Sequence, residues 1–299
     1  MARTWIAQLW KFRVPYLFLL PAAVILLMFM VVPLYRSIEY SLYSWDGVLD
    51  KQFVGWSNFN ELLHSDAFWN ALKNNVIFSF FTTLFTVLLG FAFAVVIERR
   101  LKGWKVYKFA FFVPAMISMT VIGMLFNQIL EPSFGLLNSF IGAIGLGESF
   151  QLAWLGDPSL SLYSVIAVTI WQFSGFTMLL FLAAIEEISP EIHDAATIDG
   201  VSAFSRVTSI ILPIVKRVVY MVIMLQIMFS FKVFDIIWIM TKGGPGTSSE
   251  VLGTLLYKTA FRNLQFGYAS AIAVMMTVII MIFSLIYLKF SSIGEYEKG

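Results

Sequence analysis

The chain has 299 residues, of which 59% are hydrophobic and 13% are charged, and its mean hydropathy is +0.83. Soluble domains carry about 25% charged residues. The composition therefore excludes a soluble protein and predicts an all-α protein that crosses a membrane several times. The net charge is only +2 and the basic residues group by membrane side, so no nucleic-acid partner is expected. The absence of cysteine excludes disulfides, thiol catalysis and Cys-based metal sites.

Six apolar segments are long enough to cross a bilayer, which takes about 20 apolar residues. The first follows Arg3–Arg13, where tryptophans and cations alternate with apolar residues as in an interfacial helix. A short helix is expected around Asn58–His64. Pro114 lies inside the third segment and predicts a kink there. The predicted spans are Tyr16–Tyr35, Asn75–Ile97, Phe109–Leu130, Leu160–Ile185, Ile214–Met240 and Phe266–Phe290.

Lysine and arginine are distributed unequally between the two sides that these spans define. Thirteen lie in the amino-terminal segment, the 98–108 loop, the 186–217 stretch and the end of the chain. Six lie in the loops of the opposite side. Because cytoplasmic loops are enriched in these residues, both termini and the 186–213 loop are predicted to be cytoplasmic.

The loop between the fourth and fifth spans is polar and predicts two short helices. Ser189 can cap a helix that begins at Pro190, where the missing N–H costs nothing, and Gly200 suits a left-handed residue at its end. Ser202 starts the second helix, and Pro213 predicts its bend into the next span. One face of the first helix has small residues at its centre, so that another protein could approach closely; it consists of Ile192, Ala195, Ala196 and Asp199.

The spacing of residues in this loop resembles the coupling loop of ABC importer permeases. The family pattern is Glu-Ala-Ala, three residues, Gly, nine residues and Ile-x-Leu-Pro; this chain keeps every spacing and has Asp194 for the glutamate. Further matching segments follow in family order, including LLPA at 19–22 and FVGWSNF at 53–59. The chain is most similar to the first permease of the maltose-type, multiple-sugar branch. The resemblance assigns ATPase coupling to Glu191, Asp194, Ala195, Ala196, Asp199, Gly200, Ile210, Leu212 and Pro213.

This resemblance implies the type I ABC importer fold, with six transmembrane helices and a cytoplasmic coupling loop. The amino-terminal helix, first span and outer loop would occupy residues 1–70, the permease domain 71–290 and the coupling loop 186–213. The implied partners are a second homologous permease, two ATPase subunits, an extracytoplasmic substrate-binding protein and the lipid bilayer of a prokaryotic inner membrane. The implied cargo is a sugar or oligosaccharide, and a solute such as glycerol 3-phosphate is the alternative.

The chain itself is expected to be no enzyme. A phosphate-binding loop needs Gly-x4-Gly-Lys-Ser/Thr, and no Gly-Lys dipeptide occurs in this sequence. ATP and Mg²⁺ are therefore expected on a partner ATPase, with no cofactor or metal in this chain. His193 is interpreted as a solvated or docking-surface residue. The segment KGGPGTSS at 242–249 is explained best as a turn-rich loop.

Polar residues inside the spans are candidates for the substrate route, because they are costly in lipid and usually face the bundle interior. Lys232 and Asp235 lie three residues apart, on one predicted helical face. They either pair and fix packing, or border the route. Trp171 is equally open to a packing role or a sugar-stacking role. The candidates are Asn127, Gln128, Trp171, Gln172, Ser174, Gln226, Lys232 and Asp235.

A secondary transporter and an integral membrane enzyme are the competing classes. The first would need ion-coupling residues and paired repeats or broken helices, and the second would need a convergent catalytic set. The sequence gives no sign of either. The scarcity of Lys and Arg within the spans favours a neutral solute.

Overall fold

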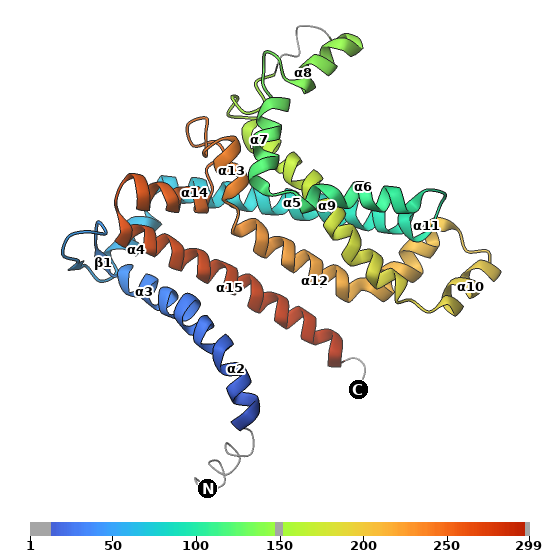
Figure 1. Cartoon of the computed structure of the whole chain (residues 1–299), viewed down its shortest axis with the longest axis horizontal. Coiled ribbons are helices and arrows are strands. Elements are labelled where there is room, and N and C mark those ends of the chain that lie inside the picture. The colour runs from blue at the N-terminus through green and yellow to red at the C-terminus, as the bar shows by residue number, and fades with distance from the viewer. Residues whose placement is uncertain (1–12, 147–151, 297–299) are drawn as a thin grey trace. The chain divides into compact units, whose positions relative to one another are not determined.

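A computed structural model describes residues 13–146 and 152–296 of the chain (Figure 1). The predicted interfacial helix at Arg3–Arg13 therefore lies almost wholly outside the described residues. The chain divides into two compact units, one formed by residues 1–64 and 258–275 and the other by residues 65–257 and 276–299. The predicted domain limits at residues 70 and 290 stay a prediction.

The described ranges contain five helices that are long and apolar enough to cross a membrane. They correspond to the first, second, fourth, fifth and sixth predicted spans. Most extend beyond the predicted limits, because a helix continues through polar residues that hydropathy does not count, such as Asp66 at the start of the second. The five helices are Leu17–Tyr40, Asp66–Glu98, Ser161–Glu186, Ala203–Phe231 and Phe266–Tyr287.

The first unit joins the end of the first span to a small hairpin. Two strands pair antiparallel, with Tyr43 opposite Phe53. The short helix expected at Asn58–His64 is confirmed as α4. The elements are α2 (Arg13–Leu26), a π-helical turn (Leu27–Val31), α3 (Val32–Tyr40), β1 (Tyr43–Ser44), β2 (Gln52–Phe53), α4 (Ser57–Leu63), a second π-helical turn (Lys258–Arg262) and the first residues of α15 (Phe266–Tyr296).

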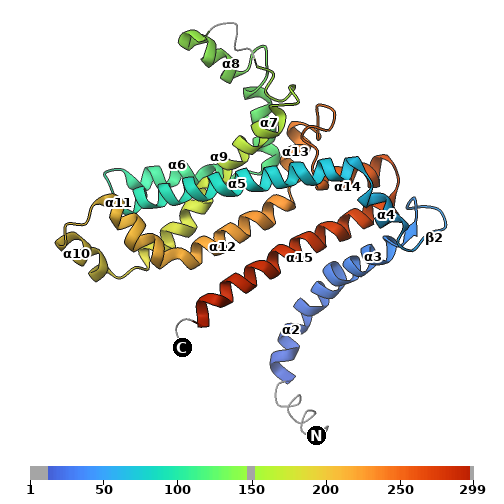
Figure 2. The ribbon, with the colours of Figure 1, turned by 180° about the vertical axis from the view of Figure 1, so that it is seen from behind.

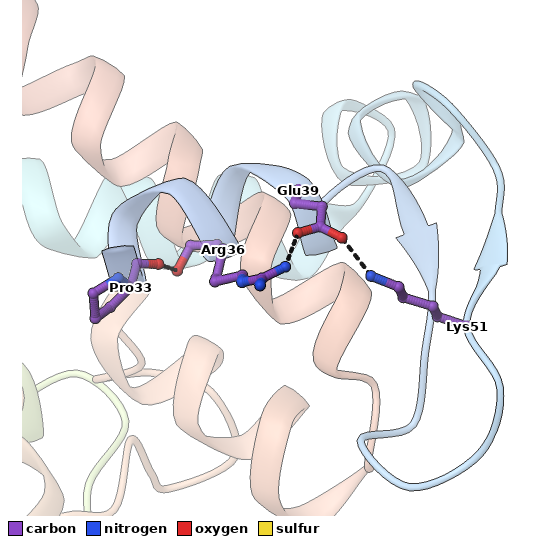
Figure 3. A network of polar contacts seen from close by, with 5 residues as sticks. Pro33, Arg36, Glu39 and Lys51 are labelled. Carbon is purple, nitrogen blue, oxygen red and sulfur yellow. Dashed lines mark hydrogen bonds and ion pairs between the residues drawn. The ribbon is translucent and has the colours of Figure 1, made fainter. Parts of the chain in front are cut away.

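Glu39 ties this hairpin to the first span, as Figure 3 shows. Its carboxylate accepts a hydrogen bond from Arg36 Nη1 at 2.6 Å and another from Lys51 Nζ in the hairpin. The Lys51 ammonium group also lies 4.7 Å from the centre of the Tyr43 ring. The hairpin is thus held to the helix by charge as well as by backbone pairing.

The second unit is built on two long helices, α5 (Asp66–Glu98) and α9 (Ser161–Glu186), flanked by α6 (Trp104–Met116) and α12 (Leu212–Phe231) (Figures 1 and 2). Gly175 allows α6 to approach α9 closely, because a Cβ atom there would lie 1.8 Å from the Phe111 carbonyl oxygen. Two apolar cores result. One is formed by residues such as Phe78, Ile122, Val165, Ile236 and Ile237, and the other by residues such as Ala94, Ile97, Met178, Phe181 and Ile185.

The third predicted span, Phe109–Leu130, is wrong as one continuous helix. It consists of α6 and α7 (Met119–Ile129), which are bent by 99° at a break. The break does not lie at Pro114, since α6 continues through this proline to Met116. It follows Ile117, and the side chain of Ser118 accepts the backbone N–H of Val121 to cap the new helix. A helix-capping serine, rather than the proline, marks the interruption.

The fifth predicted span, Ile214–Met240, is also interrupted. Helix α12 ends at Phe231 and α13 (Asp235–Met240) is separate. At the other end, α11 (Ala203–Ser205) continues through a π-helical turn (Arg206–Ile211) into α12. The chain changes direction where this turn meets α12 (Figures 1 and 2), as expected from Pro213.

The remaining elements of the second unit are short, apart from the long second part of α15. The predicted turn-rich loop at 242–249 is confirmed, since Lys242, Gly243 and Gly246 have positive φ angles. The other elements are α8 (Leu136–Ile141), a π-helical turn (Gly142–Leu146), α10 (Pro190–Ile198), α14 (Leu252–Tyr257) and the rest of α15.

Candidate functional site

Helix α10 occupies the polar loop between α9 and α12, and both of its ends are defined by the sequence. Ser189 is the N-cap residue and Pro190 the first helical residue, although the serine side chain makes no capping bond. Gly200 has φ +65°. Its N–H donates to Thr197 O at 3.2 Å, and Val201 N donates to Ala196 O at 3.0 Å. These two bonds form a Schellman motif, which confirms the left-handed end that the glycine predicts.

The most exposed stripe of α10 is displaced by one residue position from the predicted face, of which Ile192, Ala195 and Asp199 are also exposed. Ala196 is only 6% exposed and packs inward, so the prediction that it lies at the centre of a free surface is wrong. The opposite face carries two carboxylates followed by apolar groups, and Ile198 is 85% exposed. Residues at i, i+3, i+4 and i+7 share a face of a helix. The free stripe, called the docking stripe below, is Glu191, Asp194, Ala195 and Ile198.

The inward face of α10 is held by a charged cluster. Arg206 Nη2 donates to Glu98 Oε1 at 2.8 Å and to His193 Nδ1 at 3.1 Å. His193 is half-buried and one of its ring nitrogens binds Arg206, while its interpretation as a solvated or docking-surface residue stays a prediction. The other coupling candidates are placed differently from one another: Asp199, Leu212 and Pro213 are exposed, whereas Ile210 is half-buried.

The substrate-path candidate Asn127 lines a cleft of about 430 Å³ between the ends of α7 and α13. Its side-chain amide donates to Ile239 O at 3.1 Å and so joins α7 to α13. Glu131 and Lys242 also line this cleft, which gives it a carboxylate and an ammonium group. Gln128, the neighbour of Asn127, is exposed and does not line it.

Two further candidates line a second cleft, of about 400 Å³, between α5, α6 and α9. Trp171 is 44% exposed and meets Phe126 edge-on at 5.2 Å between ring centres. Ser174 is buried and donates to Trp171 O. The walls of this cleft are mainly aromatic and aliphatic. An aromatic ring and a hydroxyl can contact a sugar ring, and Trp171 also packs on Phe126. Its packing role and its sugar-stacking role both stay predictions.

Two of the three glutamine candidates, Gln172 and Gln226, form hydrogen bonds within the protein. Gln172 is 1% exposed, and its Nε2 atom donates to Ile117 O at 3.0 Å. It thus satisfies the carbonyl freed by the break between α6 and α7, while its Oε1 atom is buried with no partner. Gln226 Nε2 donates to Thr177 Oγ1 at 2.9 Å and links α12 to α9.

Lys232 and Asp235 do not share a helical face, contrary to prediction. Lys232 is the C-cap residue of α12 and Asp235 begins α13, so the interruption of the fifth span lies between them. Both are exposed, and the ion pairs formed by the described residues do not join them. Their interpretation as an intrahelical pair is therefore wrong, and a role beside the route stays a prediction.

Asn75 is a structurally important residue that the sequence analysis missed. It is fully buried; its Nδ2 atom donates to Ser230 O at 3.1 Å, and its Oδ1 atom accepts from Leu252 N at 2.9 Å. It therefore satisfies the backbone at the end of α12, as Gln172 does at the end of α6. An asparagine within an apolar span was the available signal, because such a residue must find partners.

The described side chains of this site include carboxylates, amides and apolar groups. Across residues 13–146 and 152–296, no group of three or more His, Asp or Glu side chains could hold a metal ion. The docking stripe offers two carboxylates followed by an apolar surface.

Comparison with known proteins places this geometry in context. The profile of a family described as "Binding-protein-dependent transport system inner membrane component" matches residues 86–292. The probable ABC transporter permease protein YurN of Bacillus subtilis is 39% identical over 95% of this chain and 98% of the relative. The trehalose/maltose transport system permease protein MalF of Thermococcus litoralis is 30% identical over 96% of this chain and 95% of the relative.

A solved structure has the same fold. A bacterial alginate ABC transporter, crystallised with a periplasmic protein bound to an alginate pentasaccharide, contains a chain that superposes with a TM-score of 0.84. The alignment covers 94% of each chain at 24% identity.

Proposed function

This chain belongs to the family of inner membrane components of binding-protein-dependent transport systems, and we propose that it conducts a sugar or oligosaccharide into the cell. It is a multi-pass permease subunit of an ABC importer. The interrupted spans, which the sequence analysis associated with secondary transporters, occur here in an importer permease.

The docking stripe of α10 is the observation that carries the coupling part of the proposal. Helix α10 has nine residues and ends in a Schellman motif, and the residues of its docking stripe are exposed. ATP hydrolysis is proposed to reach the chain here, through a pair of ATPase subunits. The carboxylates of Glu191 and Asp194 suit a cationic rim on that partner, and Ile198 suits an apolar socket. A second, homologous permease would complete the translocation path.

An oligosaccharide is favoured as cargo by the lining of the clefts. The cleft beside Trp171 is aromatic and aliphatic, and the cleft beside Asn127 combines an amide with one carboxylate and one ammonium group. Sugar recognition uses ring faces together with placed polar groups. The trehalose/maltose permease among the relatives supports the same cargo class.

Reconstitution tests this proposal. The chain, purified with its co-expressed permease, ATPases and binding protein, is placed in liposomes, and uptake is compared for maltose, trehalose, an alginate oligosaccharide and glycerol 3-phosphate. ATP-dependent uptake of at least one saccharide is expected. Uptake of glycerol 3-phosphate alone would contradict the sugar assignment, and ATP-independent uptake would contradict the importer mechanism.

The orientation is part of the proposal, with both termini and α10 on the cytoplasmic side. The cysteine-free chain allows single cysteines to be labelled with an impermeant reagent in intact cells. Lys102→Cys and Ser202→Cys should be protected, whereas Ser159→Cys and Thr247→Cys should be labelled. The reverse pattern would place α10 outside, where no ATPase could dock.

A further inference from the structure

Arg206 connects the docking helix to two membrane-crossing helices. It opens the π-helical turn that leads into α12, and its guanidinium group contacts Glu98, the last residue of α5, and His193 on the inward face of α10. Both views show α5, α10 and α11 at the same end of the second unit (Figures 1 and 2). A single side chain therefore joins its own π-helical turn to two other elements, α5 and α10.

The cluster of Arg206, Glu98 and His193 is partly shielded from solvent, and its hydrogen bonds have defined directions. The side chains of Arg206 and Glu98 are 27% and 15% exposed, so solvent screens their attraction less than at an open surface. A guanidinium can only donate hydrogen bonds, so His193 accepts through Nδ1 and carries its proton on Nε2. The bond consequently sets the orientation of the imidazole ring.

A second ion pair at the same end offers a comparison. Arg100 Nη2 lies 3.8 Å from Glu186 Oε1, and the two side chains are 66% and 41% exposed. Exposed pairs at this distance contribute little, because water and salt screen them and both side chains lose entropy. Arg100 is thus a matched control for Arg206: it is an arginine in an ion pair beside the same loop, without contact to α10.

The short length of α10 makes such a connection necessary. Isolated helices of fewer than about 12–15 residues are marginal in water, and α10 has nine. Its Schellman bonds close its own end but do not attach it to the spans. Ala196 offers only a methyl group to the packing. The charged cluster is the directional contact that ties α10 to the end of α5.

We propose that Arg206 is the positioning residue through which movement of α10 is transmitted to α5 and α12. This inference rests on the proposed function, since an ATPase must dock on α10 to move it. If α10 moved alone, the ATPase could hydrolyse ATP without rearranging the spans. With Arg206 in place, displacement of α10 pulls on the carboxylate at the end of α5 and on the beginning of α12 together.

The positional part of the inference is tested by distance measurement in the assembled complex. Spin labels at Thr197→Cys in α10 and Arg99→Cys after α5 report the separation of the two elements. Arg206→Met should broaden this distance distribution, and Arg100→Met should not. The charge exchange Glu98→Arg with Arg206→Glu should narrow it again. An unchanged width in Arg206→Met would overturn the proposal.

The transmission part is tested by uptake per ATP hydrolysed in liposomes. Coupling between distant sites typically changes the affinity at one of them by about 5–150-fold. Arg206→Met should therefore lower the amount of substrate taken up per ATP at least about fivefold, while ATP hydrolysis persists. Arg100→Met should keep the parent ratio. If Arg206→Met takes up as much substrate per ATP as the parent complex, the proposal is overturned. If this variant does not assemble, Glu98→Gln, which preserves shape, is measured in the same way.

The two assays separate this inference from the proposed function. Absence of ATP-driven uptake by the parent complex would refute the function, while the label distances would still decide whether Arg206 positions α10. Normal uptake with an unaltered distance distribution in Arg206→Met would refute the inference alone.

Discussion

Replacing Gly200 by valine tests whether the left-handed end of α10 sets the docking geometry. A Cβ atom at Gly200 would meet nothing within 4 Å, so the substitution adds backbone strain without a clash. The left-handed conformation costs an L-residue about 1–2 kcal/mol, and for a β-branched residue it is an outlier. That free energy corresponds to a factor of about 5–30 in the population of the native loop. The bonds that reach Thr197 and Ala196 would be lost with it.

The assay is recovery of the complex with its ATPases, followed by ATP hydrolysis stimulated by the binding protein. Gly200→Val should lower one or both by several-fold, while membrane insertion stays unchanged because the spans are not altered. Gly200→Asn is the matched control, since asparagine tolerates the left-handed region, and it should retain most of the parent activity. Equal assembly and equal stimulation in Gly200→Val would refute the reasoning.

Four further substitutions test the interrupted spans and the close packing beside them. Gly175→Ala would bring Cβ to 1.8 Å from the Phe111 carbonyl oxygen. Overpacking should therefore reduce the stability by about 1–3 kcal/mol and lower the Tm measured in detergent. An unchanged Tm would contradict the close approach of α6 to α9. Gln172→Leu removes the donor to the Ile117 carbonyl at the α6–α7 break. The free energy of unfolding, measured with a chemical denaturant, should fall by about 1–3 kcal/mol. An unchanged free energy would show that the break does not need this hydrogen bond. Lys232→Met and Asp235→Asn should affect uptake independently, so that the double variant equals their combined effects; recovery of uptake in the double variant would show that the two residues pair.

Some features of the chain follow from short stretches of residues and were therefore predictable. Apolar length locates the spans because lipid demands it along each segment. The left-handed end of α10 follows from Gly200 alone, since the conformation is a property of one residue and its two neighbours. The short helix α4 and the turn at 242–249 likewise depend on nearby residues.

The positions of the interruptions could not be predicted in this way. The apolar pattern continues through the break between α6 and α7. Pro114, the more obvious of its two local signals, lies inside a helix that persists to Met116, whereas Ser118 caps the helix after the break. The breaks are stabilised from elsewhere: Gln172 binds the carbonyl of Ile117, and Asn75 binds that of Ser230, 155 residues away in the chain.

The amino-acid sequence by itself determined that this is a membrane permease with a short helix in the polar loop between two of its spans, because hydropathy, caps and motif spacing are properties of contiguous residues. Only the tertiary structure decided which face of α10 is free, because the helix pattern permits several faces and the burial of Ala196 and the bond from Arg206 to His193 select one. It likewise separated Lys232 from Asp235, because a helix ends where its backbone finds other partners, and those partners come from distant parts of the chain.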